Sequence, residues 1–461
     1  MATGFFISET IRAKADRRMC NHTTRNLFRG FCFSTSSLVL EEGEELAFRV
    51  GEVALPAIPD GSEYALRVTE NGVAITGRDF SSLMRGYMHL LMQIEWTPED
   101  KRLMIRPIEA ASAFRLRQNR MIHFCVFPET SMTDLKKFVR LSGVLQYTHI
   151  VLEFWGMLRY DCCHALAWPS AFSKDEIREV IREIRELGME PIPMFNSLGH
   201  ATACRLASGK HVALDQDPSL YHLFTPDGWG WNIDSDEVKA LLRAVRKELY
   251  ELFGEGTYFH AGLDESYIHN RTPELYAKLP TYLKELTEEI SREGRRPMIW
   301  MDMFLPPEAY ANVRPHACTN KSPEECDRIL SSLSHDTVLV DWQYDNKEAP
   351  ISTTLYLRGR GFDLMGAPWF LPENCHAHID TAVEHELFGV MQTTWHTCAR
   401  ELPKMLPFAR HCGAAKAPWS EGSGCREEMA TLLRKVMWEP YGYEDAGWMK
   451  KQITLGAEKE A

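Results

Sequence analysis

Two adjacent carboxylates, Asp264 and Glu265, follow a short apolar stretch that ends in a histidine, within the segment YFHAGLDES. Neighbouring residues on a strand point to opposite faces, so both acids can serve one pocket only if the strand ends before them and the chain turns. Gly262 permits such a turn. The Asp-Glu pairs at 175–176 and 236–237 instead begin predicted helices, where acids suit the helix dipole. The strand-end context therefore singles out 264–265.

A pair of neighbouring carboxylates can divide the work of proton transfer. One acid stays protonated and donates its proton, while the other stays ionised and stabilises positive charge that develops in the reaction. Two side-by-side carboxylates disfavour double ionisation, so we expect the pair to hold one member protonated near neutrality. General acid catalysis is the chemistry that this spacing predicts.

The elements that must position these acids alternate regularly from residue 114 onward. Short apolar segments are followed, again and again, by helices with one polar face. One helix begins at Ser173 with Glu176 three residues later, the pattern of a capping box, and others are expected at about 236–253 and 273–292. The strands are expected near 121–124, 149–154, 191–195, 258–262, 298–300, 337–342, 363–367 and 389–393. Eight strand–helix repeats predict an α/β fold, a parallel (β/α)8 TIM barrel.

A smaller unit precedes the barrel. Two alternating strands at 64–69 and 73–77 flank Asn71-Gly72, a preferred hairpin turn, and a helix at 80–96 and a strand over RLMIRPIE follow. This composition predicts a small α/β domain. The expected boundaries are an N-terminal arm at 1–29, the small α/β domain at 30–110, the catalytic barrel at 111–445 and a C-terminal tail at 446–461.

Composition excludes several classes of partner. The chain has 461 residues and a net charge of −12, without the basic patch that nucleic acid or an anionic membrane surface requires. No apolar run approaches the roughly 18 residues of a membrane span. The 12 cysteines include no Cys-x-x-Cys pair, which indicates reduced thiols in a cytoplasmic protein. The sequence leaves homodimer formation open.

Aromatic and acidic residues gather just past the predicted strands. Active sites of such barrels lie at the carboxyl ends of the strands. Sugars have apolar C–H faces and polar rims, so aromatic walls with a few charged groups predict a carbohydrate pocket. The residues at these strand ends are Glu153, Trp155, Asn196, His200, Asp264, Glu265, Trp300, Asp302, Trp342, Tyr344, Trp369 and Trp395.

These motifs resemble those of family 20 glycoside hydrolases, the β-N-acetylhexosaminidases, with the hexosaminidase D branch as the most similar. The family's His-x-Gly-Gly-Asp-Glu signature resembles residues 260–265, and its Pro-Gly-His segment is similar to 198–200. Family members also carry a small α/β domain before the barrel. Arg117, in AFRLRQNRMIHF, stands in the position of a sugar-binding arginine.

The resemblance implies hydrolysis of terminal β-linked GlcNAc or GalNAc by an exo-acting, retaining enzyme. In this family the substrate's own 2-acetamido oxygen attacks the anomeric carbon, so only one protein acid is needed. Glu265 would be that acid, and Asp264 would orient the acetamido group and stabilise an oxazolinium ion. No cofactor and no metal are implied, and the partner is a small carbohydrate with a 2-acetamido sugar. The implied substrate-binding residues are Arg117, Glu153, His200, His260, Trp300, Asp302, Trp342, Tyr344, Trp369 and Trp395.

Three positions depart from the family pattern. Leu263 replaces the second glycine of the signature, and Thr397 replaces the glutamate that usually follows the last strand in Trp-x-Glu. A neutral threonine cannot replace a charge-assisted acceptor of the sugar's outer hydroxyls. Asn196 stands where an aspartate usually accompanies His200, which leaves a proton relay and a structural role for His200 both open. GlcNAc against GalNAc preference is therefore undecided.

Two other readings remain open from the sequence. A metal-dependent barrel hydrolase would need clustered ligands such as His-x-His on the first strand, where only His123 is found. His376 and His378 have that spacing, but a loop after the seventh strand is expected there. The second alternative is a non-catalytic glycan-binding barrel, which the departure at Thr397 suggests.

Overall fold

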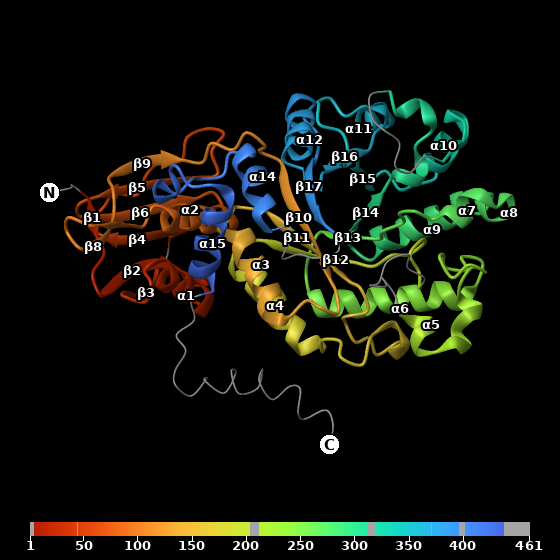
Figure 1. Ribbon diagram of the computed structural model, residues 1–461, viewed down its shortest axis with the longest axis horizontal. Helices are drawn as coiled ribbons and strands as arrows, with labels where there is room; N and C mark the ends of the chain where they lie inside the picture. The colour runs from red at the N-terminus through yellow and green to blue at the C-terminus, as the bar shows by residue number, and fades with distance from the viewer. Residues whose placement is uncertain are drawn as a thin grey trace, which may run out of the picture.

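The computed structural model describes residues 4–43, 45–202, 212–311, 319–369, 371–395 and 402–437. A small domain lies at one end of the molecule and a barrel wrapped by helices at the other (Figure 1). Among the helices of these ranges, none is long and apolar enough to cross a membrane.

Eight parallel strands close into a barrel, as the sequence predicts. The first strand pairs with both the second and the last, which closes the ring. The strands are β10 (Asn119–Val126), β11 (His149–Phe154), β12 (Glu190–Met194), β13 (Tyr258–His260), β14 (Arg296–Trp300), β15 (Val338–Trp342), β16 (Asp363–Ala367) and β17 (Gly389–Thr394).

Alternation along the strands explains how the barrel is filled. On β15, Val338, Val340 and Trp342 face the interior, whereas Leu339 joins the core between the strands and the surrounding helices. Both faces of this strand are buried, so apolar residues predominate in it. The carboxyl ends of all eight strands consequently open on one face, where the polar residues that follow them converge.

The helices cover the outside of the barrel. Within α4, the predicted capping box is present: the Ser173 amide donates to Glu176 Oε2 at 2.8 Å, and the Glu176 amide donates to Ser173 Oγ at 3.3 Å. The main covering helices are α3 (Met132–Val144), α4 (Lys174–Glu186), α6 (Asp236–Phe253), α9 (Leu279–Arg292), α10 (Pro323–Leu330), α12 (Pro372–Glu384), α14 (Met405–His411) and α15 (Cys425–Val436). Shorter helices in the connections include α5 (Ala213–Gln216), α7 (Tyr267–Arg271), α8 (Pro273–Tyr276) and α11 (Ser352–Tyr356).

The described part of the small domain contains two sheets, in which most neighbouring strands are antiparallel, and two α-helices. Its main sheet has six strands in the order β3-β2-β4-β6-β5-β9, and a second sheet has the order β1-β8-β7. The strands are β1 (Phe5–Phe6), β2 (Thr10–Asp16), β3 (Ser37–Gly43), β4 (Ala47–Gly51), β5 (Tyr64–Thr69), β6 (Gly72–Gly77), β7 (Glu95–Thr97), β8 (Arg102–Ile105) and β9 (Ile108–Ala111). The helices are α1 (His22–Phe31) and α2 (Phe80–Met92).

Three local predictions in this domain differ from the structure. The segment expected to be an N-terminal arm supplies β2, which lies inside the main sheet between β3 and β4. The helix expected over 80–96 ends at Met92, and Glu95–Thr97 is the strand β7. The single strand expected over RLMIRPIE is two strands in different sheets, because Pro107 between them lacks the amide that a continuous ladder needs.

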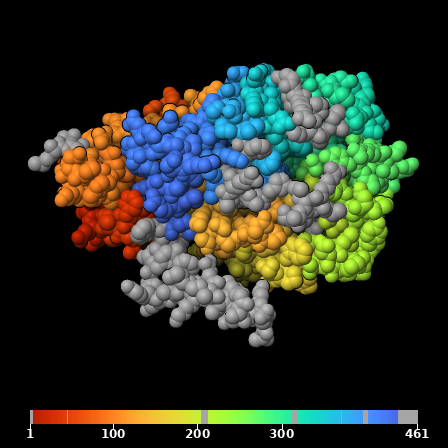
Figure 2. Space-filling model, in the orientation of Figure 1, coloured from red at the N-terminus to blue at the C-terminus, as the bar shows by residue number. Residues whose placement is uncertain are grey.

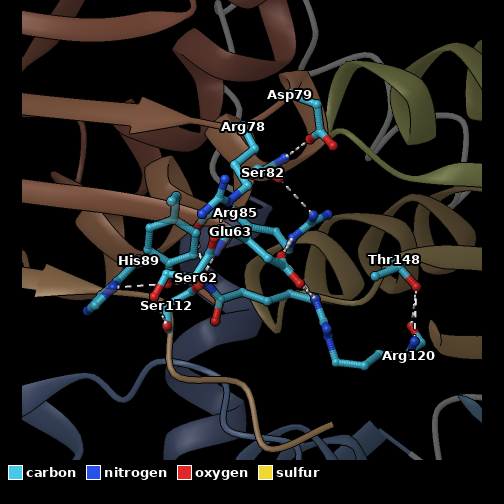
Figure 3. A network of polar contacts seen from close by, with 12 residues as sticks. Ser62, Glu63, Arg78, Asp79, Ser82, Arg85, His89, Ser112, Arg120 and Thr148 are labelled. Carbon is cyan, nitrogen blue, oxygen red and sulfur yellow. Dashed lines mark hydrogen bonds and ion pairs between the residues drawn. The ribbon is translucent and has the colours of Figure 1, made fainter. Parts of the chain in front are cut away.

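A buried ionic network joins the small domain to the barrel (Figure 3). Glu63, just before β5, accepts a hydrogen bond from Arg85 of α2 at 2.5 Å and from Arg120 of β10 at 3.0 Å. Arg120 is 2% exposed. Removing one partner of such a pair would leave the other charge buried without compensation, so the network fixes how the domain sits on the barrel.

The last described helix also spans this boundary. In Figure 2 the residues near the end of the chain, in blue, lie between the orange small domain and the barrel. Lys435 of α15 donates to the carbonyl of Phe31 in α1 at 3.2 Å, and burial lowers the pKa of Lys435 to about 8. Residues 438–461 lie outside the described ranges, so the predicted tail boundary at 446 falls there too.

Candidate active site

The turn after β13 places the two carboxylates at the mouth of the barrel. An added Cβ at Gly262 would lie 1.6 Å from Oδ1 of Asn196, so glycine is required there. Leu263 (φ 85°) and Glu265 (φ 51°) both have left-handed backbone conformations. Such conformations are costly for residues with side chains and cluster at functional sites. Leu263, the departure from the glycine signature, is fully buried in the core.

His200 contacts both carboxylates. Its Nε2 lies 3.2 Å from Asp264 Oδ2 and 3.4 Å from Glu265 Oε2. Asn196, which stands where the family usually carries an aspartate, donates through its Nδ2 to Glu153 Oε1 at 2.9 Å. The structure therefore joins His200 to both Asp264 and Glu265 and joins Asn196 to Glu153.

The pKa of Glu265 is shifted opposite to the sequence-based expectation. Burial raises the pKa of Glu265. The hydrogen bond and positive charge of His200 lower it by more than burial raises it, so the pKa lies below its ordinary value. The repulsion from Asp264 is a smaller effect. The expectation that the carboxylate pair alone holds Glu265 protonated is wrong for the free protein, because an imidazole lies between the two acids.

Asp302 is the acid that its surroundings keep neutral. Burial, and after it the negative charge of Asp264, raises the pKa of Asp302 to about 8. Its Oδ2 accepts the Glu265 amide and its Oδ1 accepts Nε1 of Trp342, both at 3.0 Å. Asp302, predicted to bind substrate, is fully buried with both oxygens engaged by the protein. It holds the backbone of Glu265 and the ring of Trp342 in place.

The raised pKa of Asp302 makes a stability prediction. The folded state keeps this proton between pH 3.8, the ordinary value, and about 8, so stability falls as pH rises through that window. Asp302→Asn removes this dependence while losing one acceptor. We expect the melting temperature of the variant, relative to wild type, to rise by about 1 °C per pH unit from pH 5 to 8. A difference in melting temperature between the variant and wild type that is the same at pH 5, 6.5 and 8 would contradict the raised pKa of Asp302.

Four aromatic side chains form one wall of the barrel mouth. Tyr344 stacks on Trp342 with ring centroids 5.1 Å apart and meets Trp369 edge-on at 5.4 Å. Its hydroxyl accepts Nε1 of Trp395 at 2.7 Å. Burial raises the pKa of Tyr344 well above its ordinary value, so the hydroxyl keeps a proton to donate. The predicted residues of strands six, seven and eight thus come together.

Trp300 and two histidines form the floor below this wall. Trp300 is fully buried, with its ring 4.5 Å from His260 and 5.8 Å from Trp395. His260 Nδ1 accepts the Gly262 amide at 3.1 Å, which anchors the turn. His123 of β10 packs against Trp395 at 4.7 Å. The floor is therefore aromatic as well, and His260 supports the turn from inside the barrel.

The sequence matches the catalytic domain of glycosyl hydrolase family 20 over residues 152–421. The chain belongs to this family. It is a glycoside hydrolase, which agrees with the expected resemblance, and the matched segment contains Asp264, Glu265 and the aromatic wall.

Solved structures of family 20 enzymes share the fold. A β-N-acetylhexosaminidase from Streptomyces coelicolor A3(2) is 16% identical with a TM-score of 0.65, covering 96% of this chain and 95% of that one. A mutant β-hexosaminidase from Streptomyces plicatus with its product GlcNAc is 16% identical with a TM-score of 0.64, covering 96% and 94%. An exo β-N-acetylglucosaminidase from Vibrio harveyi with N-acetylglucosamine is 14% identical with a TM-score of 0.63, covering 94% and 74%. The comparison with curated proteins found no match.

Arg117 does not reach the pocket of this family 20 enzyme. It precedes β10 at the amino end of the barrel, where its side chain is exposed and its guanidinium lies against Gly61 of the small domain. The pocket lies at the opposite, carboxyl ends of the strands. The prediction of a sugar-binding role for Arg117 is therefore wrong. Thr397, which replaces the glutamate of the family's Trp-x-Glu pattern, lies outside the described residues.

A buried cluster that the sequence did not predict lies on the first two strands. His123 Nε2 is 3.1 Å from Glu153 Oε2, and Cys125 Sγ is 3.5 Å from the same oxygen. The three ligand atoms lie within 4.8 Å of one another, so this cluster could hold a metal ion. Cys125 was missed because cysteine two residues after a histidine is no recognised motif. Glu153, predicted to bind substrate, belongs to this cluster.

We expect chelation to leave activity unchanged, because the resemblance implies a reaction carried out by the carboxylates at 264–265 without a metal. Dialysis against EDTA should keep kcat within about twofold of the untreated protein. A loss that added zinc restores would contradict this and make the cluster of His123, Cys125 and Glu153 functional.

The other candidate metal ligands lie on a helix instead of the expected loop. His376 and His378 belong to α12, where residues two apart project in different directions. His376 stacks on His411 with centroids 4.0 Å apart, whereas His378 is buried and contacts the carbonyl of Gln343 at 3.0 Å. The pair does not converge on one site.

Proposed function

We propose that the protein is an exo-acting, retaining β-N-acetylhexosaminidase that uses the 2-acetamido group of its own substrate. The observation that carries this proposal is the geometry at the end of β13, where Asp264 and Glu265 share one histidine beside an aromatic pocket. The names of the similar structures, which describe enzymes of N-acetylglucosaminides, support the same substrate class.

In the proposed first step Glu265 gives its proton to the glycosidic oxygen. The bond from that oxygen to the anomeric carbon breaks as the acetamido carbonyl oxygen attacks the same carbon and forms an oxazolinium ring. Asp264 accepts the acetamido N–H and stabilises the positive charge of the ring. In the second step Glu265, now ionised, takes a proton from water, whose oxygen adds to the anomeric carbon and reopens the ring with retention.

The surrounding residues support these roles. Tyr344 donates to the acetamido oxygen and directs it toward the anomeric carbon, while Trp342 and Trp369 contact apolar faces of the sugar. Asp302, kept neutral, holds the Glu265 backbone and the Trp342 ring without adding a negative charge near Asp264. A wall of aromatic rings favours a terminal sugar over an internal one, which is why exo cleavage is proposed.

The test is a panel of aryl β-glycosides with and without the 2-acetamido group. We expect cleavage of the N-acetylglucosaminide or N-acetylgalactosaminide, with the β-anomer released first as observed by NMR. The matching glucoside and galactoside should react at least about 10³-fold more slowly, because they lack the nucleophile. Comparable rates on plain glucosides, or release of the α-anomer, would overturn the proposal.

A variant of His200 tests how Glu265 is tuned. The rate constant kcat/KM should fall as pH rises through the pKa of Glu265, because only the protonated acid donates. His200→Ala removes the group that lowers this pKa, so we expect the descending limb to move to higher pH, with a lower maximum. The exposed His222, paired with Glu237, supplies the control His222→Ala. If the fall of kcat/KM at high pH occurs at the same pH in His200→Ala as in wild type, the contact of His200 with Glu265 does not tune the acid.

A further inference from the structure

The buried cluster of His123, Cys125 and Glu153 has the ligand set of a zinc site. Imidazole nitrogen, thiolate sulfur and carboxylate oxygen are the three kinds of donor that zinc takes in proteins. His123 and Cys125 are fully buried, and Glu153 is 2% exposed. Magnesium and calcium prefer oxygen donors alone, whereas iron–sulfur clusters need several cysteines. This mixture of donors therefore favours zinc, or cobalt as a substitute with the same preferences.

The separations of the three donor atoms match the edges of a tetrahedron around one ion. Nε2 of His123 is 3.1 Å from Oε2 of Glu153, and Sγ of Cys125 is 3.5 Å from that oxygen and 3.8 Å from that nitrogen. At ordinary zinc bond lengths of about 2.0–2.3 Å, donors at tetrahedral angles lie roughly 3.3–3.6 Å apart. Small side-chain shifts would therefore bring all three atoms to bonding distance of one ion.

The barrel itself holds the donors in this arrangement. His123 and Cys125 are two residues apart on β10, so both side chains point to the same face of the strand. Cys125 pairs in register with Glu153 on the neighbouring strand β11. The other oxygen of Glu153, Oε1, accepts Nδ2 of Asn196 at 2.9 Å. Such an outer hydrogen bond orients a carboxylate ligand of a metal, so the site has an outer shell as well.

We propose that this cluster binds one zinc ion through His123 Nε2, Cys125 Sγ and Glu153 Oε2, with water as the fourth ligand. Cys125 binds as the thiolate and releases its proton to solvent, while His123 binds as the neutral imidazole with its proton on Nδ1. The ion replaces the hydrogen bond between His123 and Glu153 and links β10 to β11.

The bound ion would support the floor of the barrel mouth without taking part in cleavage. The ring of His123 lies 4.7 Å from that of Trp395, whose Nε1 donates to the hydroxyl of Tyr344. Fixing His123 therefore fixes the surface on which Trp395 rests. This role is consistent with the expected insensitivity of kcat to EDTA, and the proposal does not depend on which glycoside is cleaved.

Metal titration of the full-length, reduced and metal-free protein tests the proposal. Zinc binding is measured by competition with a chromophoric chelator, and cobalt binding by absorption spectroscopy. We expect one equivalent of zinc to bind with a Kd below about 1 µM. Cobalt in the same site should show the thiolate charge-transfer band and the intense visible bands of a tetrahedral ion, because Cys125 is one of its ligands.

Variants distinguish this site from other thiols of the chain. Cys125→Ser and Glu153→Gln should each weaken zinc binding at least about 100-fold, because a lost ligand costs more than a lost outer-shell partner. Cys125→Ser should also abolish the thiolate band. The matched control is Cys326→Ser, a buried cysteine on α10, which should bind zinc as wild type does. The double variant Cys162→Ser/Cys163→Ser removes an adjacent and more accessible pair and should keep the tight equivalent.

Thermal stability gives a second readout. Only the folded barrel brings the three ligands together, so zinc at 100 times its Kd should raise the melting temperature by about 2 °C. The rise should persist in Cys326→Ser and disappear in Cys125→Ser and Glu153→Gln. A role of Cys125 in packing alone would change the melting temperature without making it depend on zinc.

Two results would overturn the proposal. One is a wild-type protein that binds no tight equivalent, and the other is a tight equivalent that survives in Cys125→Ser and Glu153→Gln or disappears in Cys162→Ser/Cys163→Ser. If Cys125→Ser fails to fold, Glu153→Gln decides. None of these measurements uses a glycoside, so failure of the zinc site leaves the hexosaminidase proposal standing, and the reverse also holds.

Discussion

Glu265→Gln is expected to lower kcat for an alkyl or sugar leaving group by about 10³- to 10⁴-fold, because general acid catalysis supplies up to this much. Glutamine is nearly the same size and keeps a hydrogen-bonding group beside His200, but it has no proton to transfer. Steady-state kinetics on GlcNAc-β-1,4-GlcNAc measure this effect. KM should change little, because Glu265 is assigned to proton transfer and not to sugar binding.

The same variant separates proton donation from a structural effect. A leaving group of low pKa, such as 2,4-dinitrophenolate, needs little protonation as it departs. The loss caused by Glu265→Gln should therefore shrink to about tenfold or less for that aryl glycoside, while a misfolded site would lose both activities equally. Equal losses on both substrates, or undiminished turnover of the disaccharide, would remove Glu265 from the role of acid.

Asp264→Asn is expected to lower kcat by about 10²- to 10³-fold, the range for removal of one group that stabilises charge at the reacting centre. Asparagine can still accept a hydrogen bond from the acetamido N–H, but it carries no negative charge to oppose the oxazolinium ion. The interaction strengthens as the ring charge develops, so the loss belongs to the transition state and appears in kcat.

The control for Asp264→Asn is Asp302→Asn, which changes a nearby acid that is largely neutral at neutral pH. Because burial and Asp264 keep the pKa of Asp302 at about 8, the charge at the site hardly changes in this variant near pH 7. We expect it to lose less of kcat than Asp264→Asn. A change confined to KM in Asp264→Asn would argue against its orienting role.

Much of this architecture follows from sequence pattern, because the pattern reflects burial. The eight strands lie where apolar runs predict them, and the capping box at Ser173 forms as its spacing implies. The ends of helices and strands in the small domain were harder to predict, because Pro107 and the turn after Met92 interrupt the pattern over only one or two residues. The segment before residue 30 has few long apolar runs, yet β2 is stabilised by strands on both sides.

The sequence predicted most of the residues that lie at the candidate site, but not all the contacts between them. Strand-end position alone brings Asp264, Glu265 and the aromatic wall together, because all eight strands open on one face. It cannot say which side chains face one another across the mouth. The contact of His200 with both acids reverses the expected pKa shift of Glu265, and the position of Arg117 before its strand places it at the wrong end of the barrel.

If the acetamido oxygen attacks the anomeric carbon, the rate must depend on the electron density of that oxygen. A series of aryl β-glucosaminides in which the N-acetyl group carries zero, one, two and three fluorines weakens this oxygen as a nucleophile while its size changes little. We predict that log kcat/KM of the wild-type protein falls steeply with each fluorine. A flat series would contradict substrate assistance and would require a nucleophile from the protein.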